Sequence, residues 1–340
     1  RQRQMCIRDR TMTSFDAFWV EKDEQGTRHQ VITRELDDLP EGDVLIEVLY
    51  SSVNYKDAMS ASGVPGVTKQ YPHTPGIDAA GIVRASTDPT LSIGSEVLVI
   101  GFDLGMNTAG GFGQYIRVPA GWVLPMPAGL SLRESMILGT AGLTAALCLE
   151  KLFWMNAQPE QGPVLVTGAT GGVGSVAIAL LSHLGFEVVA VSGKQDQVDY
   201  LKGLGAETVI GRETLSEQSS RPMLKPMYAH AVDTVGGDML SNVIKSLNPQ
   251  GSVAICGLVA SPKMDITVLP FILRGVNVLG VDSVELPLED KARNWTRLAE
   301  EWRLPNLAQM ATEVGLDGIS QTVDALLAGG VVGRTLVRVS

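Results

Sequence analysis

The 340-residue sequence contains little cysteine and little histidine: three cysteines and four histidines. The cysteines are odd in number and far apart, which argues against a disulfide framework and against a CxxC metal site. Residues 12–130 hold no cysteine and only His29 and His73. Since a catalytic zinc needs several Cys and His ligands, we expect no metal site here.

Positive charge is also scarce: the sequence has 27 Lys and Arg against 37 Asp and Glu, which gives a net charge of −10. An acidic surface repels phosphate backbones, so we expect no nucleic-acid partner. We see no apolar stretch long enough to cross a bilayer and expect no membrane partner and a cytoplasmic location. The apolar fraction of 45% suits a full core, and the length suggests two domains.

Residues 1–11 differ from the rest of the chain because four arginines crowd there. The segment lacks the apolar core and the small-residue cleavage site of a secretory signal. A mitochondrial presequence is the alternative, but this segment is short, contains Asp9 and lacks serine. We interpret residues 1–11 as a foreign leader and expect the natural start at Met12.

Residues 12–127 are predicted to form a β-rich domain. Val44, Ile46, Val48 and Tyr50 recur at every second position, as in a strand with one buried face. Further short apolar runs follow, and Gly and Pro interrupt them repeatedly. This pattern favours a compact domain of short strands.

Residues 128–283 are predicted to form a second domain. Ser131 and Glu134 form a capping-box pattern that predicts a helix to about Phe153. Strands and helices then alternate through six strands. This is typical of a doubly wound α/β Rossmann fold with a parallel sheet. We expect residues 284–340, with one helix and a final strand over 335–339, to return to the first domain.

A glycine motif, GATGGVG over residues 168–174, lies between an apolar strand and an amphipathic helix. Glycines at this junction permit a tight turn and let backbone N–H groups approach a pyrophosphate at the helix N-terminus. The alternative is a plain strand–helix turn, but the strand before and the helix after favour a dinucleotide site.

The end of the next strand reads Ser192-Gly193-Lys194 and carries no acidic residue. An NAD site typically places Asp or Glu there, about 20 residues on, for the ribose 2′-hydroxyl. A hydroxyl and an ammonium suit a 2′-phosphate instead, and Arg212 follows the third strand. We therefore predict NADPH as cofactor; the alternative is that Lys194 is simply solvated.

Several motifs together resemble the zinc-free medium-chain dehydrogenases/reductases, and within them the acrylyl-CoA reductase group of the quinone-oxidoreductase-like family. Zinc enzymes of that superfamily carry a His-Glu pair where this chain has Ile77-Asp78. The motifs are SVNYKDA (52–58), PGIDAAG (75–81), GATGGVG (168–174), DTVG (233–236), PFILRGVNVLGVDS (270–283) and GRTLV (333–337).

The resemblance implies zinc-independent, NADPH-dependent reduction of the C=C bond of acrylyl-CoA to propionyl-CoA, by hydride transfer to the β-carbon. It also implies a GroES-like first domain, a Rossmann domain, a small-molecule CoA thioester as substrate, and a homodimer formed through the sixth Rossmann strand. A general NADPH quinone or enal reductase and a non-catalytic NADPH-binding protein remain the alternatives.

Three residues after the first long strand are the catalytic candidates: Asn54, Tyr55 and Asp57. We expect Asn54 and Tyr55 to lie in a loop that faces the cleft. By resemblance Tyr55 lines the nicotinamide and is a candidate proton relay; a packing aromatic is the alternative. Asp57 is a candidate for orienting its neighbours, or a helix N-terminal acid.

The remaining candidates are cofactor contacts implied by the resemblance. They are Thr170, Gly171, Gly172 and Val173 for the pyrophosphate, Ser192, Gly193, Lys194 and Arg212 for the 2′-phosphate, Leu258, Ile272 and Ser283 for the nicotinamide, and Arg334 for the cofactor or the CoA end.

Overall fold

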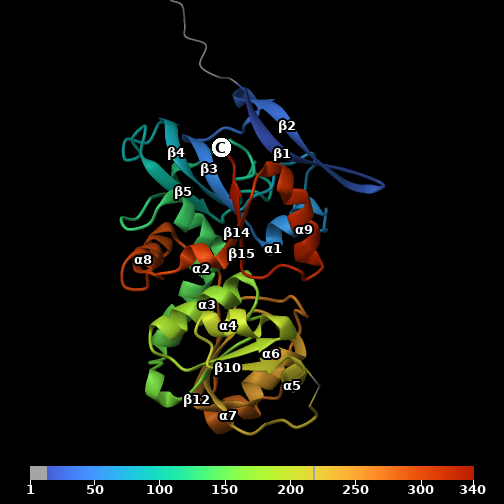
Figure 1. Cartoon of the computed structure of the whole chain (residues 1–340), viewed down its shortest axis with the longest axis vertical. Helices are drawn as coiled ribbons and strands as arrows, with labels where there is room; N and C mark the ends of the chain where they lie inside the picture. The colour runs from blue at the N-terminus through green and yellow to red at the C-terminus, as the bar shows by residue number, and fades with distance from the viewer. Residues whose placement is uncertain (1–13, 217–218) are drawn as a thin grey trace, which may run out of the picture.

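The computed structural model of the chain describes residues 14–216 and 219–340, so the interpretation of residues 1–11 lies outside the described residues. Two sheets lie one above the other along the long axis, with α2 and α3 between them (Figure 1). The helices are α1 (Tyr55–Ala61), α2 (Leu132–Trp154), α3 (Gly172–His183), α4 (Val198–Gly203), α5 (Glu213–Ser216), α6 (Gly237–Lys245), α7 (Leu269–Arg274), α8 (Leu288–Ala299) and α9 (Ile319–Leu327).

The upper sheet has seven strands, in the order β14-β15-β3-β4-β5-β7, with β6 also paired to β3. A separate hairpin of β1 and β2 lies beside it (Figure 1). On β3 the alternate residues Val44, Ile46 and Val48 are buried, as their spacing predicted. The strands are β1 (Ser14–Asp23), β2 (Gly26–Glu35), β3 (Val44–Val53), β4 (Asp78–Ser86), β5 (Glu96–Ile100), β6 (Tyr115–Val118), β7 (Val123–Pro125), β14 (Ala311–Val314) and β15 (Arg334–Arg338).

The lower sheet has six parallel strands in the order β10-β9-β8-β11-β12-β13. The chain runs outward from β8 to β10 and then returns to β11 on the other side. The strand order therefore reverses between β8 and β11, as in a doubly wound sheet, and confirms the predicted fold class. The strands are β8 (Val164–Val166), β9 (Val188–Ser192), β10 (Thr208–Gly211), β11 (Tyr228–Asp233), β12 (Leu247–Ile255) and β13 (Asn277–Gly280).

Helix α2 joins the two sheets and starts at the predicted cap, where the Ser131 side chain accepts the Glu134 N–H. It is long and apolar enough to span a membrane, so our expectation that no segment reaches that length was wrong. However, 83% of its apolar window is buried inside the protein. Gly139 has non-helical angles (φ 52°, ψ −153°) and divides α2 into two parts. The apolar residues of α2 therefore belong to the hydrophobic core that both sheets share.

The C-terminal segment returns to the upper sheet as predicted, because β15 pairs antiparallel with β3. Its content differs from the prediction: α8 and α9 are two helices, and β14 is a second strand. Strand β14 has four residues and carries little periodic signal, which explains why the sequence alone did not indicate it. The division at residues 127/128 and 283/284 stays a prediction.

Candidate functional site

The base of the candidate site is the sheet edge where the neighbouring strands β8 and β11 end. Gly168 has φ 59°, and a Cβ there would lie 2.1 Å from Thr234 Oγ1. The Asp233 carboxylate stabilises this edge, because it accepts hydrogen bonds from the Thr167 hydroxyl at 2.7 Å and from the Gly236 N–H at 2.8 Å. Burial raises the pKa of Asp233. Ligands of doubly wound sheets bind at this position, outside the carboxyl ends of the strands.

The glycine turn leads directly into α3, with Gly171 as its N-cap. The first N–H groups of a helix have no partner within it, and the helix dipole places partial positive charge there. Residues 170–173, the predicted pyrophosphate contacts, are therefore together at one helix N-terminus. Gly333, in the loop before β15, donates its N–H to the Thr170 carbonyl at 2.8 Å.

The predicted 2′-phosphate residues also lie together at the end of β9. The Lys194 N–H donates to Ser192 Oγ at 3.0 Å. A Cβ on Gly193 would lie 2.9 Å from Arg212 Cδ, so the arginine side chain passes directly over this glycine. The Lys194 ammonium is not simply solvated, because it donates to the Val331 carbonyl at 2.8 Å. Burial lowers its pKa.

Asn54 and Asp57 form the base of the predicted catalytic group. Asn54 is the N-cap of α1, so Tyr55 begins a helix rather than lying in a loop, which corrects that expectation. The Asp57 carboxylate is fully buried and accepts N–H groups of Asn54 at 2.8 Å, Gly76 at 3.1 Å and Ile77 at 2.8 Å. Burial, followed by the nearby Asp78 charge, raises the pKa of Asp57 to about 7.

Asp78, at the start of β4, is the centre of the buried polar network. Its carboxylate accepts the Ser52 hydroxyl at 2.6 Å, the Asn54 side-chain amide at 2.8 Å and the Thr140 N–H at 2.9 Å. A Cβ on Gly139 would lie 2.5 Å from an Asp78 carboxylate oxygen. The break in α2 therefore exists where this carboxylate approaches the helix backbone.

Arg334, on β15, connects this network to the glycine turn. Its Nε donates to the Ile137 carbonyl at 2.8 Å, and its Nη1 donates to Asn54 Oδ1 at 3.3 Å. A Cβ on Gly172 would lie 3.0 Å from Nη1, which places the guanidinium beside the start of α3. Nη2 is buried and has no hydrogen-bond partner among the residues that the structure describes. Burial lowers the pKa of Arg334, while Asp78 and Asp57 oppose that effect.

The last predicted contacts lie in different places. Tyr55 is 41% exposed at the first turn of α1, beside the buried Asn54. Leu258 follows the end of β12, and Ser283 follows the end of β13, so both lie at the carboxyl edge. The structure does not bring Ile272 to that edge. It lies on α7, whose Arg274 donates to the carbonyl of Leu247, the first residue of β12 at the opposite end.

Comparisons with known proteins agree with this architecture. Residues 40–128 match the alcohol dehydrogenase GroES-like domain, and residues 172–300 match the zinc-binding dehydrogenase family. The chain is 42% identical over 328 residues to acrylyl-CoA reductase AcuI of Ruegeria pomeroyi, covering 96% of this chain and 99% of that protein. The chain belongs to the medium-chain dehydrogenase/reductase family.

Two solved structures of the family superpose closely. One is Escherichia coli K-12 YhdH with bound NADPH: TM-score 0.92, 44% identity, 95% of this chain and 100% of that one. The other is Bacillus subtilis yhfP with NAD bound: TM-score 0.94, 40% identity, 96% of this chain and 100% of that one. The cofactor of the first carries a 2′-phosphate and that of the second does not; the residues around Lys194 are the predicted contacts of that phosphate.

One matching family is described as zinc-binding, yet residues 14–216 and 219–340 contain no group of three or more His, Cys, Asp or Glu that could hold a metal ion. The first-domain histidines have other partners: His29 contacts Ser320 and the Ala61 carbonyl, and His73 contacts the Gly105 carbonyl. The residues present therefore do not fit a catalytic zinc.

Sequence reasoning missed three members of this medium-chain dehydrogenase/reductase site: Asp78, Thr140 and Val331. Asp78 carried a signal, because it stands where the zinc enzymes have an acid, but the sequence did not show that it would be the centre of a buried hydrogen-bond network. Thr140 and Val331 carried no signal in the sequence, since each forms a hydrogen bond with a residue that is distant along the chain.

Proposed function

We propose that this chain catalyses the NADPH-dependent reduction of the C=C bond of acrylyl-CoA to propionyl-CoA. The relative from Ruegeria pomeroyi, named acrylyl-CoA reductase and matched over nearly the whole length of both chains, carries the substrate assignment. The residues at the end of β9, together with the E. coli relative that holds NADPH, support the cofactor.

The chain's residues fit this cofactor. Residues 170–173 and the N-terminus of α3 would hold the pyrophosphate, and the buried Arg334 guanidinium, whose Nη1 lies beside Gly172, offers positive charge close to it. Ser192, Lys194 and Arg212 would hold the 2′-phosphate. When bound, NADPH supplies the hydride that the β-carbon of the enoyl thioester receives.

The remaining residues orient the reacting groups. Asp78 and Asp57 fix the Asn54 amide from two sides, because its Nδ2 donates to Asp78 at 2.8 Å and to Asp57 at 3.2 Å. Asn54 in turn accepts from Arg334, which holds the guanidinium near the glycine turn. Tyr55, exposed beside this network, is our candidate for a cofactor contact and for relaying the proton that completes the reduction.

We further propose a cytoplasmic homodimer. Three apolar residues of α7 and its N-cap, directly before edge strand β13, are 65–68% exposed: Val268, Ile272 and Leu273. An exposed apolar patch beside an unpaired strand edge favours pairing with a second copy. This assignment gives Ile272 a role at the subunit contact in place of the predicted nicotinamide contact.

The test of the reaction is NADPH consumption with acrylyl-CoA, free acrylate and a small quinone in parallel, repeated with NADH. We expect fast turnover only with acrylyl-CoA and NADPH. Equal or faster turnover of the quinone would replace the proposal with a general quinone or enal reductase. Tight NADPH binding without turnover of any of the three would indicate a non-catalytic NADPH-binding protein.

A further inference from the structure

Lys291, on α8, is a fully buried lysine that the proposed reaction does not use. Its ammonium donates to the Ile100 carbonyl and to the Val284 carbonyl, both at 2.8 Å. It also lies 3.3 Å from the ring centroid of Phe102. Two carbonyls and one aromatic face match its three N–H donors, so the charged form is fully satisfied without a contacting carboxylate.

The two carbonyls come from different sheets. Ile100 is the last residue of β5, where it pairs with Asp78 on β4. Val284 lies in the loop after β13, and its carbonyl also accepts the Phe102 N–H at 3.1 Å. A Cβ on Gly101 would lie 3.2 Å from the Ser283 carbonyl oxygen, so the two loops are in direct contact.

This contact lies at the carboxyl edge of the Rossmann sheet. The loop after β13 serves the second mononucleotide half, and ligands of such sheets bind outside the carboxyl ends of the strands. The loop containing Phe102 approaches that edge from the upper sheet. Lys291 therefore binds together two loops that face one another across the two sheets, beside the predicted nicotinamide contact Ser283.

Phe102 is held in an unusual conformation at this junction. Its φ is 53°, which is uncommon for a bulky residue and costs energy unless the surroundings fix it. Its ring stacks on Trp122, with centroids 5.6 Å apart and planes 8° from parallel. The ammonium and the stacked indole together fix the orientation of this aromatic side chain.

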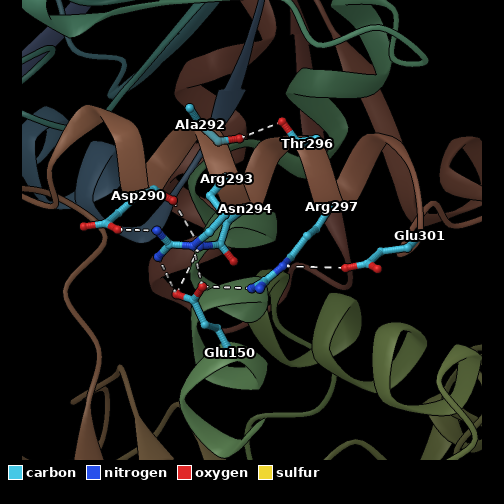
Figure 2. Close-up of polar contacts among 8 residues, drawn as sticks. All are labelled: Glu150, Asp290, Ala292, Arg293, Asn294, Thr296, Arg297 and Glu301. Atoms are coloured by element: carbon cyan, nitrogen blue, oxygen red, sulfur yellow. Dashed lines mark hydrogen bonds and ion pairs between the residues drawn. The ribbon is translucent and has the colours of Figure 1, made fainter. Parts of the chain in front are cut away.

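Helix α8, which carries Lys291, is attached to α2 by ion pairs and a hydrogen bond. Arg293 and Arg297, further along α8, both pair with Glu150 on α2, at 2.9 Å and 2.8 Å (Figure 2). Asn294 donates to the same carboxylate at 3.2 Å. Three side chains of α8 therefore attach it to α2, and Arg293 and Asn294, the two nearer Lys291 in the chain, keep that attachment when the Arg297 contact is removed.

We infer that Lys291 is a positioning residue of the reductase site: its ammonium joins the loops at Phe102 and Val284 and so fixes the wall of the cleft beside the nicotinamide end. The inference rests on the proposed function for its kinetic readout. Lys291→Met removes the buried charge and leaves the Ile100 and Val284 carbonyls without the ammonium, which costs some stability. A misplaced cleft wall lowers the rate, so the readout of a positioning role is kinetic, with stability measured alongside.

The test compares Lys291→Met, Lys291→Arg and the control Arg297→Met in the full chain. Arg297→Met weakens the attachment of α8 to α2 but leaves both loop contacts intact. For Lys291→Met we expect kcat/KM for acrylyl-CoA to fall by at least about tenfold, with the Kd for NADPH within about twofold of wild type. Lys291→Arg should restore most of the rate, and Arg297→Met should lie within about twofold of wild type.

The pH profile gives a second readout. Asp282 and Glu285 of the loop and Asp78 of β4 favour the ammonium, but burial dominates and lowers the pKa of Lys291 to about 8. Wild-type kcat/KM should therefore fall above about pH 8, and Lys291→Arg should extend activity to higher pH because a guanidinium stays charged. An unchanged alkaline limb in Lys291→Arg would overturn the inference.

Other outcomes are equally decisive. If Lys291→Met keeps the wild-type kcat/KM, or if Arg297→Met loses as much kcat/KM as Lys291→Met does, Lys291 makes only a structural contact and the inference is wrong. If Lys291→Met does not fold, Phe102→Leu removes the ring contact, and unchanged kcat/KM in it would overturn the inference.

If the wild type does not turn over acrylyl-CoA, the fluorescence of Trp122 gives a readout that requires no substrate. It is measured as the difference in emission between the wild type and a Trp122→Phe protein. It should change near pH 8 in the wild type and not in Lys291→Arg; the absence of this difference would overturn the inference separately from the proposed function.

Discussion

The carboxylate of Asp78 accepts both the backbone N–H and the hydroxyl of Thr140, at 2.9 Å and 2.5 Å. Thr140 begins the part of α2 that follows the Gly139 break, so a strand of one sheet caps a helix that packs on the other. Caps are normally supplied by the residue just before a helix. Here the cap comes from β4 and couples the two halves of the molecule at the candidate site.

Asp78→Asn should destabilise the protein strongly. The substitution removes a charge that balances the buried Arg334, and it places an amide N–H₂ among groups that donate to Asp78. Breaking such a buried network typically costs about 3 kcal/mol or more in the free energy of unfolding. Denaturant unfolding measures this cost. Thr140→Val, which loses one hydroxyl and keeps the charge, should cost about 1 kcal/mol; equal costs in the two variants would contradict the central role of Asp78.

Lys194→Met should weaken NADPH binding and leave NADH binding unchanged. Lys194 follows β9, its backbone N–H contacts Ser192 and its ammonium contacts Val331; of the two cofactors, only NADPH would present a phosphate to these residues. Loss of one charge-assisted contact predicts a rise of about tenfold in the Kd for NADPH. Titration with both cofactors measures the selectivity. Equal weakening of both would show instead that the Lys194–Val331 contact supports the whole cofactor crevice.

The contribution of Asp57 to stability should decrease as pH rises. Its pKa in the folded protein is about 7, above the ordinary value of 3.8, so the folded state binds more protons than the unfolded state between these values. Stability from this group is therefore full below about pH 4 and declines until about pH 7. Relative to Asp57→Asn, the wild-type free energy of unfolding should fall by up to about 4 kcal/mol across that window. Unfolding curves of both proteins between pH 4 and pH 8 measure it, and parallel pH dependences would refute it.

Patterns within short stretches of the sequence predicted much of the fold. The glycine motif and the alternation of strands and helices follow from periodicity and turn chemistry within short windows. The buried network does not, because Asp78 and Thr140 lie 62 positions apart and meet only when the two sheets pack on α2. The contact of Lys194 with Val331 spans 137 positions. Ile272 is a different case: the family resemblance predicts a nicotinamide contact, while in this chain the residue lies on α7, whose Arg274 contacts the first residue of β12, and the contact stays a prediction.

Arg334→Met should weaken both cofactors equally, unlike Lys194→Met. The guanidinium approaches Gly172 at the glycine turn, and the pyrophosphate expected there is common to NADPH and NADH. Nη1 is the guanidinium nitrogen that lies beside this turn. We expect the Kd of each cofactor to rise about tenfold or more. Arg334→Lys should recover only part of this, since an ammonium cannot donate to Ile137 and Asn54 in the fork geometry of a guanidinium. Loss of NADPH binding alone would place Arg334 at the 2′-phosphate, and unchanged binding of both would leave it as the counter-charge of Asp78 and Asp57.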